Sequence, residues 1–177
     1  MKSVFDKYLF LFGLAGVLIA LDQWTKSLIR NNLSLGETWL PAGLDWLSPY
    51  ARIVHWYNTG AAFGMFQQGS SIFMVLAIVV ICAIIYYFPK VEMHDWTLRV
   101  AMSMQLAGAA GNLIDRVLRD GKVTDFISVG TFPVFNVADA SISVGTAILL
   151  LGVYLQERAV KKAQALDSNQ QSGTTGE

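Results

Sequence analysis

The sequence predicts an all-α integral membrane protein, a four-transmembrane-helix bundle with a small β-containing platform on the outer surface of the membrane. Three observations predict this fold. Of the 177 residues, 54% are hydrophobic and only 15% are charged, against roughly 25% charged in an ordinary soluble domain. The mean hydropathy is +0.45. Four apolar runs follow one another along the chain. Because the net charge is zero, we expect no nucleic-acid partner.

The four apolar runs approach the roughly 20 residues that a helix needs to cross a hydrocarbon core. We expect helices at about residues 8–29, 70–88, 97–119 and 137–158. The second run contains no charge and is followed by Pro89, which ends a helix. The third is the weakest, because it contains Arg99, Asn112, Asp115 and Arg116. Those polar side chains must face protein rather than lipid.

The chain is expected to form one membrane-embedded domain over residues 1–165, followed by a disordered polar tail over residues 166–177. The lysine-bearing start and first apolar run also fit a signal peptide, but no A-x-A cleavage site follows them. An even number of helices places both termini on one side of the membrane. The basic residues divide almost equally between the two sides. Three of them, Lys26, Arg116 and Arg119, have candidate carboxylate partners. If these three are left out of the count, the remaining basic residues favour cytoplasmic termini.

The segment between the first two helices, about residues 31–68, is too apolar to be a flexible, unstructured linker. Residues 51–58, ARIVHWYN, are rich in β-branched and aromatic side chains, which predicts a short strand. Aromatic rings are stable at a membrane–water interface. The segment contains five such residues: Trp39, Trp46, Tyr50, Trp56 and Tyr57. We therefore expect a small β platform lying on the membrane.

Ionised side chains inside hydrocarbon cost at least ~2.5–3.5 kcal/mol each, so each one requires a partner or a role. Asp22 and Lys26 are four residues apart near the end of the first helix. They form either a simple ion pair or the floor of a nearby site. In NTGAAFG, the amide of Asn58 could hold a peptide backbone. Gly60 and Gly64 could instead serve close helix packing.

The stretch GAAGNLIDR, residues 108–116, combines small residues with polar ones. Small residues allow another backbone to approach closely. Asn112 and Arg116 are four apart and therefore share one helix face. Asp115 and Arg119 have the same spacing and could pair. The stretch is either a structural polar ladder between helices or part of a functional site.

Two aspartates, Asp125 and Asp139, lie fourteen residues apart among apolar neighbours. A straight helix would separate them by ~21 Å. Gly130 and Pro133 lie between them, and proline breaks a helix interior, so the chain must turn. We expect Asp125 after the third helix and Asp139 in the first turn of the fourth, close together at one depth.

Each aspartate has a structural explanation of its own. Asn136 can act as the N-cap of the fourth helix, which puts Asp139 at the third helical position in an approximate capping box. Asp125 could be a solvated loop carboxylate. Together, however, two close carboxylates in a low-dielectric site share a proton. One can then accept a proton from water while the other donates one, and the helix N-terminus favours Asp125 as the proton carrier.

The ordered motifs LDQWTK, NTGAAFG, GNLIDR, VTDFI and FNVAD resemble those of the bacterial lipoprotein signal peptidase family, signal peptidase II. The resemblance runs from Asp22 to the end of the fourth helix. It implies an inner-membrane aspartic endopeptidase that removes signal peptides from diacylglyceryl-modified prolipoproteins. Cleavage would occur just before the lipid-modified cysteine. The resemblance also implies an active site near the outer face and cytoplasmic termini.

The resemblance assigns roles by position. It implies the catalytic residues Asp125 and Asp139. It implies the substrate-binding residues Asn58, Asn112, Arg116 and Asn136. It implies the structural polar residues Asp22, Lys26 and Asp115. It further implies no metal and no other cofactor, contact with membrane phospholipid, and a monomer.

Two other functions fit intramembrane polar residues. A small transporter or proton channel could relay charge through Asp125, Asp139, Asp115 and Arg116, although the chain has no internal repeat of the kind typical of transporters. A non-catalytic assembly factor could use the small-residue motifs for helix association. Cleavage of a lipid-modified peptide distinguishes the peptidase from both.

Overall fold

The computed structural model describes residues 4–60 and 69–174. Its helices are α1 (Val4–Asn32), α2 (Ser70–Tyr87), α3 (Trp96–Leu118) and α4 (Val137–Thr174). Its strands are β1 (Thr38–Trp39), β2 (Ala51–Asn58) and β3 (Val123–Val129), with short 3-10 turns at Asp45–Leu47 and Phe88–Lys90. Within these residues, three helical stretches are long and apolar enough to cross a membrane: Val4–Asn32, Ser70–Lys90 and Val137–Arg158.

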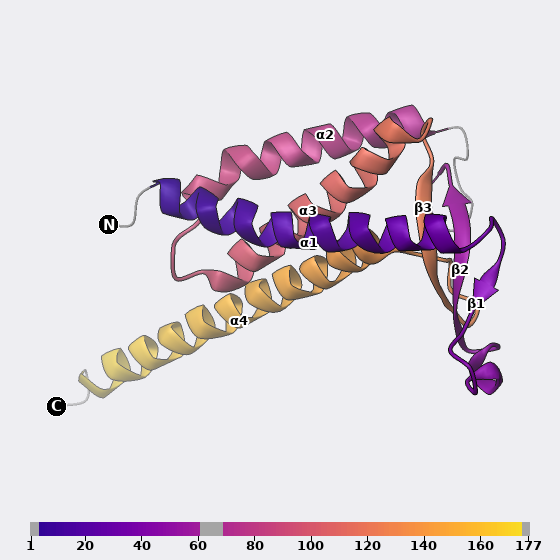
Figure 1. The fold of residues 1–177 in the computed structure, drawn as a ribbon. Helices are drawn as coiled ribbons and strands as arrows, with labels where there is room; N and C mark the ends of the chain where they lie inside the picture. Colours follow the sequence, from indigo (N-terminus) through magenta and orange to yellow (C-terminus); the bar gives the residue numbers. More distant parts are fainter. Residues whose placement is uncertain (1–3, 61–68, 175–177) are drawn as a thin grey trace.

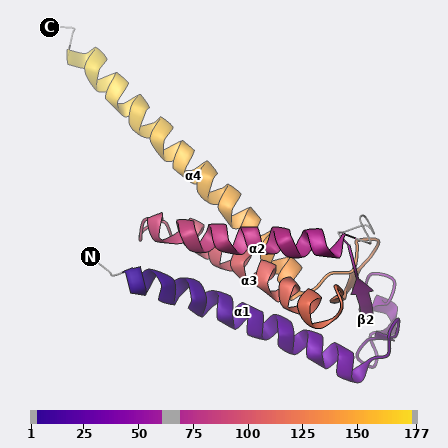
Figure 2. The ribbon, with the colours of Figure 1, turned by 90° about the horizontal axis from the view of Figure 1, so that it is seen from above.

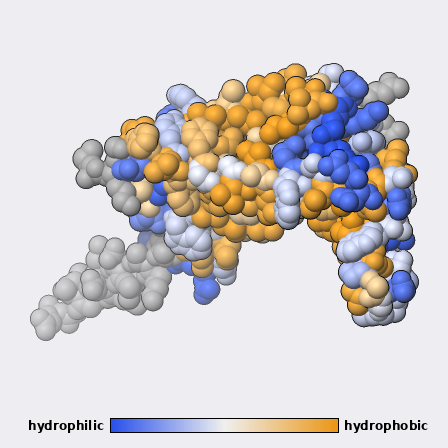
Figure 3. All heavy atoms as spheres, viewed as in Figure 1, coloured by the Kyte–Doolittle hydropathy of each residue, from blue (hydrophilic) through white to orange (hydrophobic). Residues whose placement is uncertain are grey.

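The four helices lie lengthwise, and the sheet stands across one end of them (Figure 1). The first and last described residues lie at the opposite end, where α4 diverges and extends beyond the other helices (Figure 2). Hydrophobic side chains cover the middle of the helices on the face shown in Figure 3, and hydrophilic ones gather near the sheet. This distribution suits a protein whose helices lie in lipid.

Helix α3 is the central element, because it packs against α1, α2 and α4. Its charged side chains at Arg99, Asp115 and Arg116 are buried among these neighbours. Helix α2, in contrast, carries no charged residue and exposes large apolar side chains, such as Ile72 and Val75. The polar residues that weaken the hydropathy of the third apolar run thus face protein, as expected from the cost of exposing them to lipid.

Two glycines of α3 allow the close approach of other helices. A Cβ at Gly108 would lie 2.5 Å from the carbonyl oxygen of Ala138 in α4 and would overlap the side chain of Ile142. A Cβ at Gly111 would lie 2.7 Å from Oδ2 of Asp22 in α1. The close packing predicted from the small residues of GAAGNLIDR is therefore confirmed.

The sheet is antiparallel, with strand order β1-β2-β3. The strand expected at residues 51–58 coincides with β2. Asp125 follows the third helix as expected, but the alternative of a solvated loop carboxylate is wrong, because this buried residue lies in β3 opposite Trp56 of β2. The sequence VTDFISV is rich in β-branched and aromatic residues, a composition that favours a strand once a partner strand is available.

The helix ends differ from the expected ones mainly in α1 and α4. Helix α1 extends beyond the expected 8–29 at both ends. Helix α4 continues past residue 158 to Thr174, into the segment expected to be a disordered tail, and the disorder of that tail stays a prediction. Lys161 and Glu157 pair at 3.8 Å along this extension, at a spacing that supports a helix. Gly64 and the rest of residues 61–68 lie outside the described residues.

Candidate active site

A tight turn brings the end of β3 back to the start of α4. Gly130 has φ +51°, a left-handed conformation that glycine adopts without strain. After the turn, Phe135 pairs with Ile127: its N–H donates to the Ile127 carbonyl at 3.0 Å, and its own carbonyl accepts from the Ile127 N–H at 2.8 Å. The predicted turn between the two aspartates is therefore confirmed, and it places Asn136 beside β3.

The first turn of α4 is capped from two directions. The Asp139 N–H donates to Asn136 Oδ1 at 2.9 Å, and the Asn136 N–H donates to Asp139 Oδ2 at 3.2 Å. This reciprocal arrangement is the predicted capping box. The Ala138 N–H donates to Asp22 Oδ1 of α1 at 2.9 Å. These bonds satisfy N–H groups that a helix start leaves free, and they fix the position of the Asp139 carboxylate.

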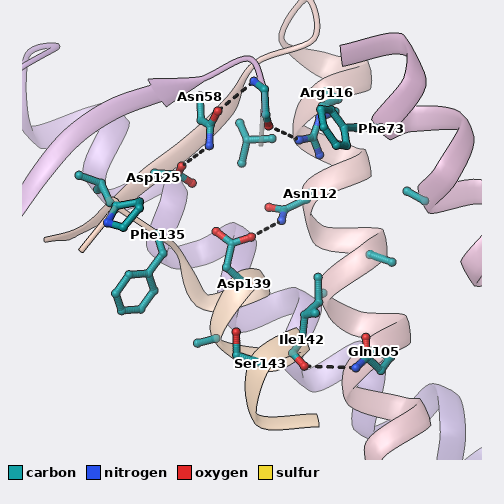
Figure 4. A pocket seen from close by; sticks show the side chains of 18 of the residues that line it. Asn58, Phe73, Gln105, Asn112, Arg116, Asp125, Phe135, Asp139, Ile142 and Ser143 are labelled. Atoms are coloured by element: carbon teal, nitrogen blue, oxygen red, sulfur yellow. Dashed lines mark hydrogen bonds between the residues drawn. The ribbon is translucent and has the colours of Figure 1, made fainter. Parts of the chain in front are cut away.

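The carboxylate of Asp125 is held by two neutral amides. Asn136 Nδ2 donates to its Oδ1 at 2.7 Å, and Asn58 Nδ2 donates to its Oδ2 at 3.1 Å. Asp139 is held similarly, because Asn112 Nδ2 donates to its Oδ1 at 2.7 Å. Both carboxylates line the same pocket (Figure 4). The two aspartates are thus brought together, as the sequence predicts.

The surroundings of Asp125 change its acidity. Only 1% of the residue is exposed. This burial, followed by the negative charge of Asp139, raises the pKa of Asp125 to about 7, against the opposing effect of its hydrogen bonds from Asn58 and Asn136. A carboxyl group with such a pKa can both hold and release a proton near neutral pH.

A second group of buried charges lies beside this pair and is centred on Lys26. The Lys26 ammonium lies 2.9 Å from Asp22 Oδ2 and 3.6 Å from Asp115 Oδ2. It also donates to Asn112 Oδ1 at 3.0 Å. The residue is fully buried, so the pair of Asp22 and Lys26 is not a solvated interfacial one. Asn112 also donates to Asp139, so hydrogen bonds through this one side chain connect the cluster of charges to Asp139.

Asp115 contacts further cations beyond Lys26. Nitrogens of Arg30 and Arg119 each lie 3.6 Å from its Oδ1, which confirms the predicted pairing with Arg119. Its Oδ2 accepts the Thr124 N–H at 2.9 Å. Arg30 also donates to Thr124 Oγ1 at 3.0 Å. Sequence analysis missed Arg30, although its position four residues after Lys26 places the two on one helix face.

Arg116 and Asn58 together hold the backbone of Gly60 rather than each other. The Arg116 guanidinium donates to the Gly60 carbonyl at 3.3 Å and lies over the ring of Phe73 at 5.4 Å. Asn58 Oδ1 accepts the Gly60 N–H at 2.9 Å. Asn58, Asn112 and Arg116 all line the pocket. Asn136 does not line it, because this residue is fully buried behind the two aspartates.

The pocket has a volume of about 700 Å³ and lies between α2, α3, α4 and the sheet. One wall consists of apolar side chains of α2: Phe73, Leu76, Ala77 and Val80. The carboxylates lie at the end of the pocket nearer the sheet, and Gln105 and Ser143 lie farther from it (Figure 4). Among the described residues, the structure contains no cluster of three or more histidine, cysteine or acidic residues that could hold a metal ion.

Comparisons with known proteins point to one family. The family model described as signal peptidase (SPase) II matches residues 14–155. The lipoprotein signal peptidase of Halalkalibacterium halodurans is 37% identical over 150 residues, covering 82% of this chain and 92% of that protein. The lipoprotein signal peptidase of Enterococcus faecalis is 36% identical over 155 residues, covering 86% and 92%. A bacterial membrane enzyme solved in meso at 2.3 Å resolution is similar in structure, with a TM-score of 0.75 and 30% identity over 83% of this chain and 88% of that one.

Proposed function

The chain belongs to the signal peptidase II family, and on that premise we propose that Asp125 and Asp139 are the catalytic pair of a membrane aspartic endopeptidase. The enzyme removes signal peptides from prolipoproteins. Its substrates carry a diacylglyceryl group on cysteine, and it cleaves just before that cysteine. The observation that carries this proposal is the pair of carboxylates that face one pocket and are hydrogen-bonded by neutral amides.

The reaction follows from the different surroundings of the two acids. Asp139 lies in the first turn of α4, where the helix dipole stabilises a negative charge, and it takes a proton from water. The water oxygen then attacks the scissile carbonyl carbon, whose oxygen receives the proton of Asp125. When the carbon–nitrogen bond breaks, Asp139 passes its proton to the leaving cysteine amine. One of the two hydroxyls of the tetrahedral intermediate gives its proton to Asp125 as the carbonyl re-forms, so the product is a carboxylic acid and the pair is restored.

The asparagines and Arg116 position the reacting groups. Asn112 orients Asp139 through the 2.7 Å bond to its Oδ1. Asn58 and Arg116 hold Gly60 at the pocket wall, where the substrate backbone enters. Because Asn136 is fully buried, we assign it to positioning the two aspartates rather than to substrate contact.

The membrane arrangement forms part of the same proposal. Helix α3 spans the membrane as a fourth helix inside the ring of α1, α2 and α4, and residues 1–165 form one domain. The sheet lies on the outer surface, with exposed aromatic residues at Trp39, Trp46, Tyr50 and Trp56 at the lipid headgroups. Both termini are then cytoplasmic. Phospholipid surrounds a monomeric chain, which has no nucleic-acid partner.

The proposal is tested by cleavage of a diacylglyceryl-modified prolipopeptide by the purified chain in lipid, with the cut located by mass spectrometry. The wild type should cleave just before the modified cysteine. Asp125→Asn and Asp139→Asn should each lower the rate by at least about 10³-fold, because each removes one of the two proton-transfer groups. Asp45→Asn, which changes an exposed carboxylate of the platform, is the matched control and should cleave at the wild-type rate.

Two results would contradict the assignment. Cleavage that persists in both variants would exclude Asp125 and Asp139 as the catalytic pair. A wild-type chain that cleaves no lipid-modified peptide but conducts protons across vesicles would support the transporter or channel instead.

A further inference from the structure

The far end of the pocket, where Gln105 and Ser143 lie (Figure 4), contains two polar side chains in otherwise apolar surroundings. The side-chain amide of Gln105 donates from Nε2 to the Ile142 carbonyl at 3.2 Å and to Thr146 Oγ1 at 2.7 Å. Within the described part of the chain, neither Gln105 Oε1 nor the Ser143 hydroxyl makes a hydrogen bond. One acceptor and one donor are thus available in a part of the pocket that is otherwise apolar.

The distance from the catalytic pair relates this far end to a substrate position. Gln105 precedes Asn112, which bonds Asp139, by seven residues on α3, or ~10.5 Å along the helix. An extended peptide advances ~3.3 Å per residue, so about three residues span this distance. A signal peptide that lies along the pocket from the scissile bond therefore places its third residue before the bond beside Gln105 and Ser143.

The backbone of such an extended segment needs hydrogen-bond partners. In apolar surroundings, unsatisfied N–H and C=O groups are strongly unfavourable. The helices that form the pocket walls already use their backbone groups internally, and Leu76, Ala77 and Val80 of α2 offer no polar atom. Gln105 and Ser143 supply the missing acceptor and donor.

We propose that Gln105 and Ser143 form a polar subsite that binds the backbone of the signal peptide three residues before the scissile bond. Gln105 Oε1 accepts the N–H of that residue, and the Ser143 hydroxyl donates to its carbonyl. This inference rests on the proposed peptidase function. The subsite recognises the main chain and therefore tolerates different side chains at this position.

A purely structural role for Gln105 makes a different prediction. Its bonds to Ile142 and Thr146 connect α3 with α4, and polar side chains commonly join membrane helices in this way. Thr146 shares this connection but does not line the pocket. The variant Thr146→Val therefore removes the shorter of the two interhelical bonds of Gln105 and leaves the proposed subsite in place.

The experiment compares two diacylglyceryl prolipopeptides that differ in one atom: an amide nitrogen or an ester oxygen at the third residue before the scissile bond. The ester lacks the N–H that Gln105 would bind. In the wild-type chain in lipid, kcat/KM should be about threefold to tenfold lower for the ester, the effect of one hydrogen bond. Gln105→Leu should show a similar loss with the amide substrate and no further loss with the ester. Thr146→Val should retain the wild-type ratio between the two substrates.

The outcomes separate this inference from the proposed function. If Gln105→Leu retains the full difference between amide and ester, or if Thr146→Val abolishes the difference as Gln105→Leu does, the subsite is excluded although the peptidase function stands. If the wild type cleaves neither substrate, the proposed function fails, and the subsite fails with it.

Discussion

The protein holds two pairs of carboxylates side by side, and their partners differ in charge. Asp22 and Asp115 share the ammonium of Lys26, at 2.9 and 3.6 Å. Asp125 and Asp139 are bonded by the neutral amides of three asparagines. A cation fixes a buried carboxylate in its ionised form, whereas an amide satisfies its oxygens without deciding where the proton lies. Asp22, Asp115 and Asp125 are all buried, so burial alone does not distinguish the two pairs. The charge of the partner separates the structural pair from the proposed catalytic one.

Asn112 is the residue at which the two pairs meet. Its Oδ1 accepts from Lys26 at 3.0 Å, and its Nδ2 donates to Asp139 at 2.7 Å. The bond from Lys26 determines which end of the amide faces Asp139, because an ammonium can only donate. The charged pair thereby orients the neutral surroundings of the proposed catalytic pair without delivering a cation to it.

The largest effect on stability is expected from removing the cation of the structural pair. Lys26→Met should lower the free energy of unfolding by about 3–5 kcal/mol, because it leaves the buried carboxylate of Asp22 without its counter-ion. Thermal or denaturant unfolding in detergent micelles measures this change. Lys161→Met, which breaks an exposed pair with Glu157, is the matched control and should leave unfolding unchanged.

An unchanged unfolding transition in Lys26→Met would contradict this expectation, because it would mean that Asp22 needs no cation to be buried. Lys26→Met should also reduce cleavage below the temperature at which it unfolds, since the orientation of Asn112 depends on the ammonium.

The second prediction concerns the pH dependence of cleavage, which follows from the protonation of Asp125 and Asp139. Burial and the charge of Asp139 raise the pKa of Asp125 to about 7, so the pair loses its shared proton above that pH. The rate of cleavage should fall toward about tenfold per pH unit above pH 7. A rate that stays constant up to pH 9 would show that Asp125 does not carry the proton.

The raised pKa of Asp125 also makes the free energy of unfolding depend on pH. The ordinary pKa of an aspartate is 3.8, and that of folded Asp125 is about 7. Between these values the folded chain holds a proton that the unfolded chain has lost. Raising the pH from about 4 to about 7 therefore lowers the free energy of unfolding. Asp125→Asn should remove this contribution, which unfolding curves at several pH values would detect.

Local chemistry explains which parts of this site could be predicted from the sequence. The capping box of Asn136 and Asp139 and the turn at Gly130 depend on residues close together in the chain, so their spacing reveals them. Strand β3 was missed because its identity depends on pairing with β2, more than sixty residues earlier. The bond from Ala138 to Asp22 was missed for the same reason: it joins the start of α4 to α1, and only the packing of the helices brings them together.

The smallest effect is expected at the outer edge of the charged cluster. Arg30, which is 12% exposed, lies 3.6 Å from Asp115 and donates to Thr124 Oγ1 at 3.0 Å. Arg30→Met and Thr124→Val should each lower the free energy of unfolding by about 0.5–1.5 kcal/mol, the contribution of one hydrogen bond. Because Thr124 precedes Asp125 in β3, both variants should also lower the rate of cleavage slightly, by displacing that carboxylate.

A double-mutant cycle of these two variants separates the charge of Arg30 from its hydrogen bond. If the bond to Thr124 is what Arg30 contributes, the combined variant should be no less stable than Arg30→Met alone. Additive losses would instead assign the effect of Arg30 to Asp115. In that case Arg30 would act only through its ion pair with Asp115 and would have no part in holding β3 beside the proposed catalytic pair.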